Sequence, residues 1–437
     1  MEAFGETSKY KAYKYSGEDW IAEIPAHWEV RKLKHLFREK KHTQNMALNC
    51  GSISFGEVVT KDDDKIPLST KASYQEVLSG EFLINPLNLN YDLISLRIGL
   101  SKIDVVVSAG YIVLKEKIKI SREYFNYLLH RYDVAYMKLL GSGVRQTISF
   151  NHIANSLLIL PPETEQVTIA NFLDQKTAQI DEAIAIKEKQ IALLKERKQI
   201  IIQKAVTQGL DPNVPMKDSG VDWIGEIPEH WEMKKLKFIS TYFKGFAFKS
   251  DDFSGVGVPI VKASNIKEHS VSNIQSFIAK DNQRREFERF RLSTGDVVVS
   301  TVGSKPEITN SAVGQLCSVN SEYNESYLNQ NTVCIRPSRK LDKRFLKYVF
   351  ASKYVRNEFD RKALWIANQA YLEVDEILDI LIAIPDFDEQ SSISDYLDSQ
   401  ATKFSRTIDS QLQQIEKLKE YKTTLINSAV TGKIKVA

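Results

Sequence analysis

The chain contains twice the stretch Ser16-Gly17-Glu18-Asp19-Trp20-Ile21-Ala22-Glu23-Ile24-Pro25-Ala26-His27-Trp28-Glu29, in slightly different form. The second copy reads Ser219-Gly220-Val221-Asp222-Trp223-Ile224-Gly225-Glu226-Ile227-Pro228-Glu229-His230-Trp231-Glu232, at a constant offset of 203 residues. Two tryptophans, a proline and a histidine recur in fixed register, and these residue types are too rare for coincidence to be a good explanation. The repeat therefore indicates two structural units of similar design.

A second repeated segment follows each copy of the first. It opens with Glu165-Gln166 and Phe172-Leu173-Asp174, and it returns as Glu389-Gln390 and Tyr396-Leu397-Asp398 at an offset of 224. The two offsets differ by 21, so the material between the two repeated segments is about 21 residues longer in the second half. The two halves therefore share these two repeated segments. The material between the segments, here called the variable middle, differs between the halves.

Apolar residues recur in the second repeated segment at spacings of three, four and seven, which is typical of a coiled-coil helix. Neither copy shows a second apolar face in this pattern, so we expect the two helices to bury their stripes against each other. Two repeats in one chain favour a pseudo-two-fold relation, which makes the paired helices antiparallel. The expected seam residues are Leu173, Ile180, Ile184, Ile191, Leu194 and Ile201 in the first helix and Leu397, Phe404, Ile408, Ile415, Leu418 and Leu425 in the second.

The two variable middles carry short apolar runs bounded by glycine or polar residues, which predict strands at residues 103–108, 259–262 and 296–300. We therefore predict an α+β protein. Two mixed α/β domains are separated by two long helices that form an intramolecular antiparallel coiled coil, with a pseudo-two-fold internal repeat. The expected boundaries are 1–160 and 211–384 for the globular domains and 161–210 and 385–437 for the helical regions.

The composition is that of an ordinary globular protein. The 437 residues include 59 Lys+Arg and 56 Asp+Glu, a formal net charge of +3 that argues against a strongly polybasic binder. The three cysteines, Cys50, Cys317 and Cys334, are too few and too scattered for a disulfide framework or a zinc site. No targeting segment and no membrane-spanning apolar run is evident, so we expect a soluble, cytoplasmic protein.

Motifs of enzyme chemistry are scarce in the sequence. There is no glycine-rich nucleotide loop, no His-Glu-x-x-His and no Gly-x-Ser-x-Gly, so we expect no catalytic residue, no metal site and no cofactor on this chain. The run Asn85-Pro86-Leu87-Asn88 partly resembles the Asn-Pro-Pro-Tyr/Phe loop of amino-methyltransferases but lacks the stacking aromatic residue. His27 and His230 have no neighbouring metal ligands, and a turn that packs the adjacent indole is the favoured interpretation.

Nucleic-acid binding is a more plausible function, although the composition alone does not compel it. Residues 231–300 contain 12 Lys+Arg against 8 Asp+Glu, a local excess of the kind that phosphate contacts need. Amide side chains interleaved with these cations could contact base edges, although a solvated basic face remains an equal alternative for any single residue. The candidate nucleic-acid contacts are Arg97, Lys102, Arg145 and Gln146 in the first domain and Lys244, Lys249, Lys262, Asn265, Arg284, Arg285, Asn368 and Gln369 in the second.

Taken together, the repeated Asp-Trp-Ile-x-Glu-Ile-Pro-x-His-Trp-Glu motif, the Glu-Gln-x-x-Ile segments after Pro161 and Pro385, and the helices that end in Ala-Val-Thr resemble the DNA specificity subunit of type I restriction-modification systems. The resemblance covers essentially the whole chain. It implies that each globular domain is a target-recognition domain for one half of a bipartite, asymmetric DNA site, and that the coiled coil sets the spacer. One departure is that the Gly257-Val258-Pro259-Ile260 strand motif has no clear counterpart near Cys50.

The resemblance also implies partners that supply the chemistry. Modification subunits, expected to be two, would carry S-adenosylmethionine and methylate adenine, and a restriction subunit would use ATP and Mg²⁺ for translocation and cleavage. Three alternatives stay open: a specificity subunit of a methylation-only system, a coiled-coil adaptor without a DNA function, and a stand-alone methyltransferase, which the absent glycine loop disfavours.

Overall fold

A computed structural model of the chain describes residues 8–87, 96–137, 148–267, 269–304, 313–366 and 369–436. The chain divides into two compact units. The first unit comprises Met1–Lys187 and Gln413–Ala437, and the second comprises Glu188–Leu412. Each unit contains a globular domain together with parts of two long helices, α5 (Glu163–Gln208) and α9 (Phe387–Val430).

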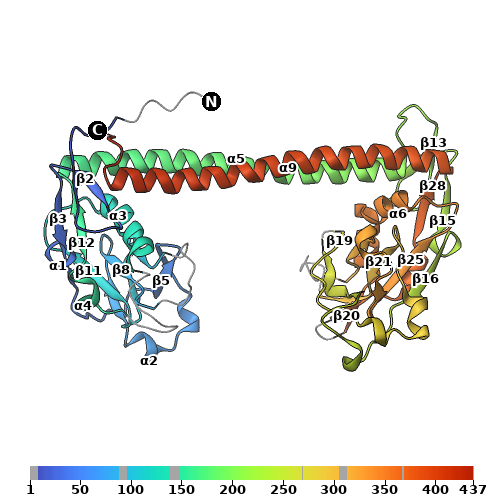
Figure 1. The fold of residues 1–437 in the computed structure, drawn as a ribbon, viewed down its shortest axis with the longest axis horizontal. Helices are drawn as coiled ribbons and strands as arrows, with labels where there is room; N and C mark the ends of the chain where they lie inside the picture. Colours follow the sequence, from blue (N-terminus) through green and yellow to red (C-terminus); the bar gives the residue numbers. More distant parts are fainter. Residues whose placement is uncertain are drawn as a thin grey trace. The chain divides into compact units, whose positions relative to one another are not determined.

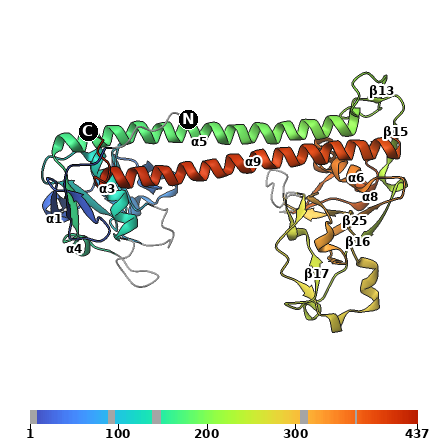
Figure 2. The same ribbon diagram turned by 45° about the horizontal axis from the view of Figure 1, so that its top comes forward.

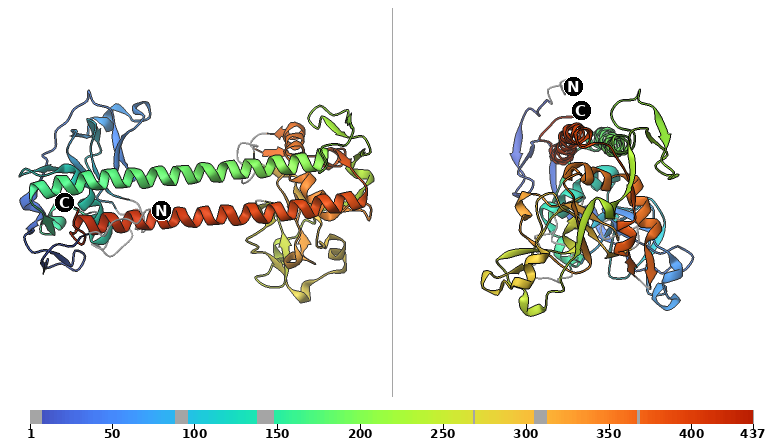
Figure 3. Two further views of the ribbon diagram at one scale, coloured as in Figure 1. Left: turned by 90° about the horizontal axis from the view of Figure 1, so that it is seen from above. Right: turned by 90° about the vertical axis from the view of Figure 1, so that its right-hand side faces the viewer.

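The two long helices lie side by side in each unit and run in opposite directions (Figure 1, Figure 3). In the first unit the beginning of α5 packs against the end of α9, and Leu173 and Ile180 share a core with Leu425 and Ala429. In the second unit the end of α5 packs against the beginning of α9, and Ala205 shares a core with Leu397. The predicted antiparallel coiled coil is confirmed.

Every predicted seam residue is buried or partly buried, because an apolar stripe with heptad spacing on one helix faces the matching stripe on the other. Lys187 interrupts the stripe, and its Nζ donates to Oε1 of Gln414 at 2.5 Å. One expectation was wrong: α5 carries further apolar side chains outside the seam, and in the second unit Leu193 and Ile200 are 54% and 59% exposed.

The ends of the helices follow the local sequence. Pro161 and Pro162 precede α5, and Pro385 stands two residues before α9, where the missing amide hydrogen of proline costs least. Gly209 directly follows α5, and Gly432 comes two residues after the end of α9. Both glycines adopt a φ value of +72°. This left-handed conformation suits glycine at a helix C-terminus.

The first unit is built on a four-stranded antiparallel sheet in the order β4-β11-β8-β9, with α3 (Arg122–Ala135) against it. Three strand pairs surround this sheet: β1 with β2, β3 with β12, and β5 with β6, while β7 pairs with β10. The strands are β1 (Tyr13–Tyr15), β2 (Glu23–Pro25), β3 (Glu29–Lys32), β4 (Phe37–Glu39), β5 (Gly51–Ser54), β6 (Glu57–Thr60), β7 (Gln75–Val77), β8 (Phe82–Ile84), β9 (Ile98–Leu100), β10 (Val105–Val107), β11 (Ile112–Glu116) and β12 (Leu157–Leu160), and the short helices are α1 (Leu33–Leu36), α2 (Leu68–Lys71) and α4 (Phe150–Ile153).

The second unit repeats this frame and adds to it. Its four-stranded sheet has the order β16-β25-β21-β23, with smaller sheets β20-β17-β24 and β22-β27-β26. Its strands are β13 (Met216–Asp218), β14 (Glu226–Pro228), β15 (Glu232–Lys235), β16 (Ser240–Lys244), β17 (Val258–Val261), β18 (Ile266–Lys267), β19 (Ser270–Val271), β20 (Phe277–Ile278), β21 (Val297–Ser300), β22 (Val302–Gly303), β23 (Leu316–Ser318), β24 (Tyr327–Leu328), β25 (Thr332–Pro337), β26 (Leu364–Ile366), β27 (Gln369–Tyr371) and β28 (Leu381–Ile384), and its helices are α6 (Lys343–Phe350), α7 (Lys353–Lys362) and α8 (Val374–Leu378).

The two units correspond element by element. The hairpins β1–β2 and β13–β14 match, as do the pairs β3–β12 and β15–β28 that close each domain. β8 and β21 occupy the same position in their four-stranded sheets, and α3 corresponds to α6 (Figure 2). The predicted strands at 103–108, 259–262 and 296–300 appear as β10, β17 and β21. The three-stranded sheet β20-β17-β24 is reduced in the described part of the first unit to the pair of β7 and β10 with a parallel bridge from Cys50 to Val106.

Candidate nucleic-acid interface

The repeated Pro-x-His-Trp motif joins each globular domain to the start of the long helix that follows it. In the first unit, Trp28 is fully buried, and its Nε1 donates to Oε2 of Glu165 on α5 at 3.0 Å. Nε2 of His27 lies 2.6 Å from Oε1 of the same carboxylate, and the Tyr10 hydroxyl donates to Oε2 at 2.8 Å. The expectation that the motif packs an indole is confirmed.

The second unit repeats this arrangement. Trp231 is fully buried and its Nε1 donates to Glu389 of α9 at 3.2 Å, while His230 lies 2.8 Å from the same carboxylate oxygen. A single glutamate near each helix start thus accepts from the histidine and tryptophan of its own domain. Each histidine therefore joins its domain to the long helix. Among the described residues there is no group of three or more His, Cys, Asp or Glu side chains that could hold a metal ion.

Each motif also holds the end of the opposite helix. A Cβ on Gly432, which follows α9, would lie 2.4 Å from Cδ of Pro25 and 2.9 Å from Cη2 of Trp28. In the second unit Gly209, after α5, lies against Trp231 and Pro228 in the same way, with somewhat more room. The start of one helix and the end of the other are therefore fixed to one domain in each unit.

The glutamine beside each anchoring glutamate caps a helix of the globular domain. Oε1 of Gln166 accepts from the amide of Ser121, the N-cap residue of α3, at 2.9 Å. Oε1 of Gln390 accepts from the amide of Asp342, the N-cap residue of α6, at 2.8 Å. In both cases the amide nitrogen of the glutamine donates to the proline carbonyl just before the long helix. The recurring Glu-Gln pair thus connects the long helix to the domain at two points.

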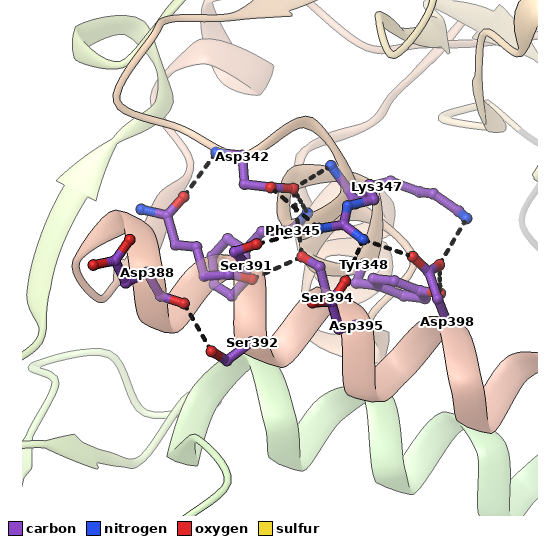
Figure 4. Close-up of polar contacts among 12 residues, drawn as sticks. Asp342, Phe345, Lys347, Tyr348, Asp388, Ser391, Ser392, Ser394, Asp395 and Asp398 are labelled. Atoms are coloured by element: carbon purple, nitrogen blue, oxygen red, sulfur yellow. Dashed lines mark hydrogen bonds and ion pairs between the residues drawn. The ribbon is translucent and has the colours of Figure 1, made fainter.

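A tyrosine and an aspartate continue this contact along the helix. Figure 4 shows Tyr348 of α6 directed at Asp398 of α9, and the hydroxyl donates to Oδ1 at 2.5 Å. Arg344 donates to both Asp395 and Asp398 at 2.6 and 3.3 Å. In the first unit the hydroxyl of Tyr127 donates to Asp174 at 2.7 Å, and burial and this aspartate raise the pKa of Tyr127 to about 12. A tyrosine of the globular domain and an aspartate of the long helix are therefore in contact in both units.

Because Glu165 accepts hydrogen bonds from its own domain, we expect the first unit to lose stability in acid. Partial burial opposes ionisation of Glu165, but hydrogen bonds from His27, Trp28 and Tyr10 outweigh it, so the pKa of Glu165 lies below its ordinary 4.5. A carboxylate whose pKa falls on folding stabilises the protein above its ordinary pKa, and this contribution is lost as the pH falls through the folded-state pKa. We expect Glu165→Gln to destabilise the protein at about pH 7 and to have a smaller effect at an acidic pH below the folded-state pKa of Glu165. Urea unfolding of both chains at the two pH values checks this, and a difference independent of pH would contradict it.

The predicted DNA contacts of the first domain fall in different environments. Lys102 is exposed and lines a groove of about 650 Å³ with Tyr127 and Arg131. Arg97 is only 6% exposed, its backbone amide and its Nε both donate to the fully buried Asp133, and its Nη atoms have no partner within the described residues. The prediction that Arg97 contacts DNA is not supported, because its guanidinium is buried inside the domain. Arg145 and Gln146 lie outside the described residues.

We expect substitutions in the buried ion pair of Arg97 and Asp133 to change the free energy of unfolding. Removing one partner of a buried ion pair leaves an uncompensated charge, so Asp133→Ala is expected to cost about 3–5 kcal/mol of unfolding free energy. Replacing both residues by apolar ones, Arg97→Met with Asp133→Leu, removes the buried charge and should recover most of that loss. Urea denaturation of the unchanged chain and of the two variants provides the measurement. A loss no larger in Asp133→Ala than in the double variant would contradict this.

In the second domain most of the predicted cations face solvent. Lys244, Lys249 and Arg285 are exposed. Arg284 is also exposed, but it pairs with Asp252 and stacks on Phe287 with its guanidinium carbon 4.6 Å from the ring centroid. The ammonium of Lys262 is less accessible, since it donates to Ser276 at 2.7 Å and lies 4.2 Å from the ring centroid of Phe253. Contacts of these residues with DNA stay predictions.

The amide candidates of the second domain divide similarly. Asn265 is 7% exposed; its Nδ2 donates to the carbonyls of Ser272 and Asn273, and its Oδ1 accepts from the amide of Lys262. The prediction that Asn265 reads a base edge is not supported, because backbone groups use its whole amide. Gln369 is exposed on β27, whereas Asn368 lies outside the described residues.

The sequence predicted a loop at Trp365 and Gln369, whereas the structure has the strand β26 paired with β27 there. Leu364, Trp365 and Ile366 of β26 are 53%, 44% and 62% exposed, and β26 is the edge strand of its sheet. A run of three apolar residues without alternation predicts a buried strand, so exposure of all three was not foreseeable from the pattern. Thymine methyl groups are one kind of surface that such side chains can contact.

Comparison with known protein families identifies the fold and its role. The family model described as the type I restriction modification DNA specificity domain matches residues 25–196 and 228–420. The chain is 27% identical over 340 residues to the type I restriction enzyme MjaVIII specificity subunit of Methanocaldococcus jannaschii, covering 76% of this chain and 75% of that protein. It is 24% identical over 258 residues to the EcoKI specificity subunit of Escherichia coli, covering 58% and 52%.

Solved structures agree on the fold. A chain from a study of complex assembly and conformational transition of the type I R-M system aligns with a TM-score of 0.65 at 15% identity, covering 93% of this chain and 98% of that one. The HsdS subunit from Thermoanaerobacter tengcongensis aligns with a TM-score of 0.51 at 16% identity, covering 94% and 98%. No helix among the described residues is long and apolar enough to cross a membrane. With two matched specificity domains that span most of its length, this chain belongs to the DNA specificity subunits of type I restriction-modification systems.

Proposed function

We propose that this chain is the non-catalytic specificity subunit of a type I complex. Each of its two globular domains would recognise one half of a bipartite, asymmetric DNA site. The observation that carries the proposal is the duplicated frame. Two domains that share a four-stranded sheet are attached to the helices by matching Trp–Glu and Gln–amide contacts, yet they differ in their middles. Two domains that are attached to the helices in the same way but have different surfaces are suited to recognising two different DNA sequences.

The coiled coil would set the distance between the two half-sites. Two binding modules on a stiff connector gain effective concentration for the second site only when the connector matches the spacing. The double attachment of each domain, to the start of one helix and the end of the other, supports this because it restrains the domain against rotation about either helix.

The chemistry would come from partners. Modification subunits, expected in two copies, would carry S-adenosylmethionine and methylate adenine, and a restriction subunit would supply ATP- and Mg²⁺-dependent cleavage. A system whose partners only methylate is the second candidate, and this chain would have the same role in it. A coiled-coil adaptor without DNA function is disfavoured by the family match.

The proposal is tested by purifying the chain alone and together with the modification subunit encoded with it. We expect the chain alone to bind no S-adenosylmethionine and the complex to transfer labelled methyl groups to DNA. We expect DNA retention by the complex to weaken steeply as the salt concentration rises. Methyl transfer by the isolated chain would contradict the assignment, as would a stable complex that binds DNA without any sequence preference.

A further inference from the structure

The hairpin of β5 and β6 in the first unit carries a phenylalanine at its tip. Ser54 pairs with Glu57, which leaves Phe55 and Gly56 as a two-residue turn. Both turn residues have positive φ values, +48° and +82°, as in a type I′ turn, where asparagine followed by glycine is preferred. A bulky side chain is strained at the first of these positions, because its Cβ crowds the neighbouring backbone. Phenylalanine is therefore a poor choice for the hairpin itself.

The ring of Phe55 gains little from packing inside the domain. It is 79% exposed, so burial of the ring does not offset the strain of the turn. Strained backbone conformations cluster at functional sites, where the position of the side chain is used in binding or catalysis. A strained and exposed aromatic residue thus points to a ligand that covers the ring.

The turn beneath the ring is held firmly by two glycines. A Cβ on Gly56 would lie 2.9 Å from Cδ1 of Leu96 and 3.1 Å from Nε2 of His130 on α3. A Cβ on Gly99 of β9 would lie 2.7 Å from the carbonyl oxygen of Gly56. The turn therefore fits against β9 and α3 only because both residues lack a side chain. Phe55 stands on a fixed backbone, which lowers the entropy cost of inserting its ring into a ligand.

The charges around the tip favour DNA bases over phosphates as its contact. Glu57 directly follows the turn and is exposed. Its carboxylate would repel a phosphate group, but it can accept a hydrogen bond from N4 of cytosine. Lys102 is exposed and lines the same surface groove of about 650 Å³ as Phe55, so an ammonium is available there for the DNA backbone. A ring and a carboxylate at the tip suit a hairpin that reaches the base pairs.

We propose that Phe55 is a wedge that inserts between two base pairs of the half-site bound by the first domain and partly unstacks them. This inference rests on the proposed function, which makes double-stranded DNA the ligand. Apolar side chains that insert in this way kink the duplex, and pyrimidine–purine steps such as TA and CA unstack at the lowest cost. Phe55 therefore adds specificity for a flexible step without forming a hydrogen bond to either base pair.

The wedge is tested with the complex of this chain and its modification subunit, on duplexes that carry the motif mapped for the natural complex. 2-Aminopurine, whose fluorescence rises when it is unstacked, replaces one purine at a time in the half-site that is retained when residues 233–384 are exchanged for those of another specificity subunit. We expect a rise at one pyrimidine–purine step apart from the methylated adenine. Phe55→Asn should abolish this rise and increase the dissociation constant about tenfold, as for the loss of one stacked ring. Phe55→Trp should retain the rise and the affinity.

Protein stability distinguishes a wedge from a structural role. Because asparagine suits the turn, Phe55→Asn should raise the urea midpoint of the complex while it weakens DNA binding. The salt dependence of the dissociation constant should not change, since no phosphate contact is lost. Leu68→Asn is the matched control, because Leu68 is 75% exposed in the same domain. This control should leave both the dissociation constant and the fluorescence unchanged.

Three results would overturn the inference while leaving the proposed function intact. They are unchanged DNA binding by Phe55→Asn, a fluorescence rise that persists in this variant, and weaker binding accompanied by a lower urea midpoint. An equal loss of affinity in Leu68→Asn would also overturn it. A natural complex that binds DNA without sequence preference would contradict the proposed function itself.

Discussion

Replacing Trp231 by alanine is expected to lower the free energy of unfolding of the second unit by about 3–5 kcal/mol, the usual cost of truncating a fully buried aromatic side chain. The indole is fully buried, lies 6.5 Å from the ring centroid of Phe345 and donates to Glu389. Its loss leaves a cavity where the domain meets the start of α9 and the end of α5. We therefore expect the two helix ends to lose protection from hydrogen exchange together.

Trp223 provides a matched control in the same repeated motif. It is 43% exposed, so Trp223→Ala should cost about 1 kcal/mol or less. Urea denaturation combined with hydrogen exchange distinguishes the two variants. Similar losses for Trp223→Ala and Trp231→Ala would show that the buried indole is not what attaches the domain to the helices.

Lengthening both long helices by one heptad is expected to change the preferred DNA site more than any single substitution. Seven residues add about 10 Å of helix, which corresponds to about 3 base pairs of B-DNA. Because heptad insertion preserves the seam, the complex should still assemble and methylate, with the same two half-sites separated by a longer gap.

Insertion of one heptad in a single helix should instead abolish or strongly reduce methylation. The seam residues of one helix would then face the wrong partners, while the Trp28 and Trp231 anchors still hold both ends, so we expect a strained chain with little or no methylation activity. Methylation mapping of cells that express each variant provides the measurement. An unchanged gap after matched insertion would show that the helices do not set the spacing.

The sequence predicted the parts of this fold that depend on short-range periodicity. The heptad spacing of residues such as Ile180 and Ile184 identifies a helix and its buried face without any tertiary information. The repeated Trp28 and Trp231 motifs pointed to two equivalent domains, and the proline and glycine breaks placed the helix ends. Each of these sequence patterns lies within a few residues of the helix, turn or helix end that it predicts.

The candidate DNA contacts could not be predicted in the same way. Arg97 appeared to be a free cation because Asp133, its partner, stands 36 residues away in sequence and meets it only in the folded sheet–helix core. Asn265 has the side chain of a base reader, but the residues after β19 bring the carbonyls of Ser272 and Asn273 to its amide. Exposure of Leu193 and Ile200 was missed because a second apolar row of two residues is hidden beside a strong seam.

The most direct measurement is methylation mapping by single-molecule sequencing after exchange of one domain. The chain is co-expressed with its modification subunit, either in its natural form or with residues 233–384 replaced by the equivalent segment of another specificity subunit. We predict a bipartite, adenine-methylated motif for the natural chain. For the exchanged chain, one half of the motif should change while the other half and the gap are retained. A continuous motif, or an exchange that alters both halves or neither, would contradict the assignment of one half-site to each domain.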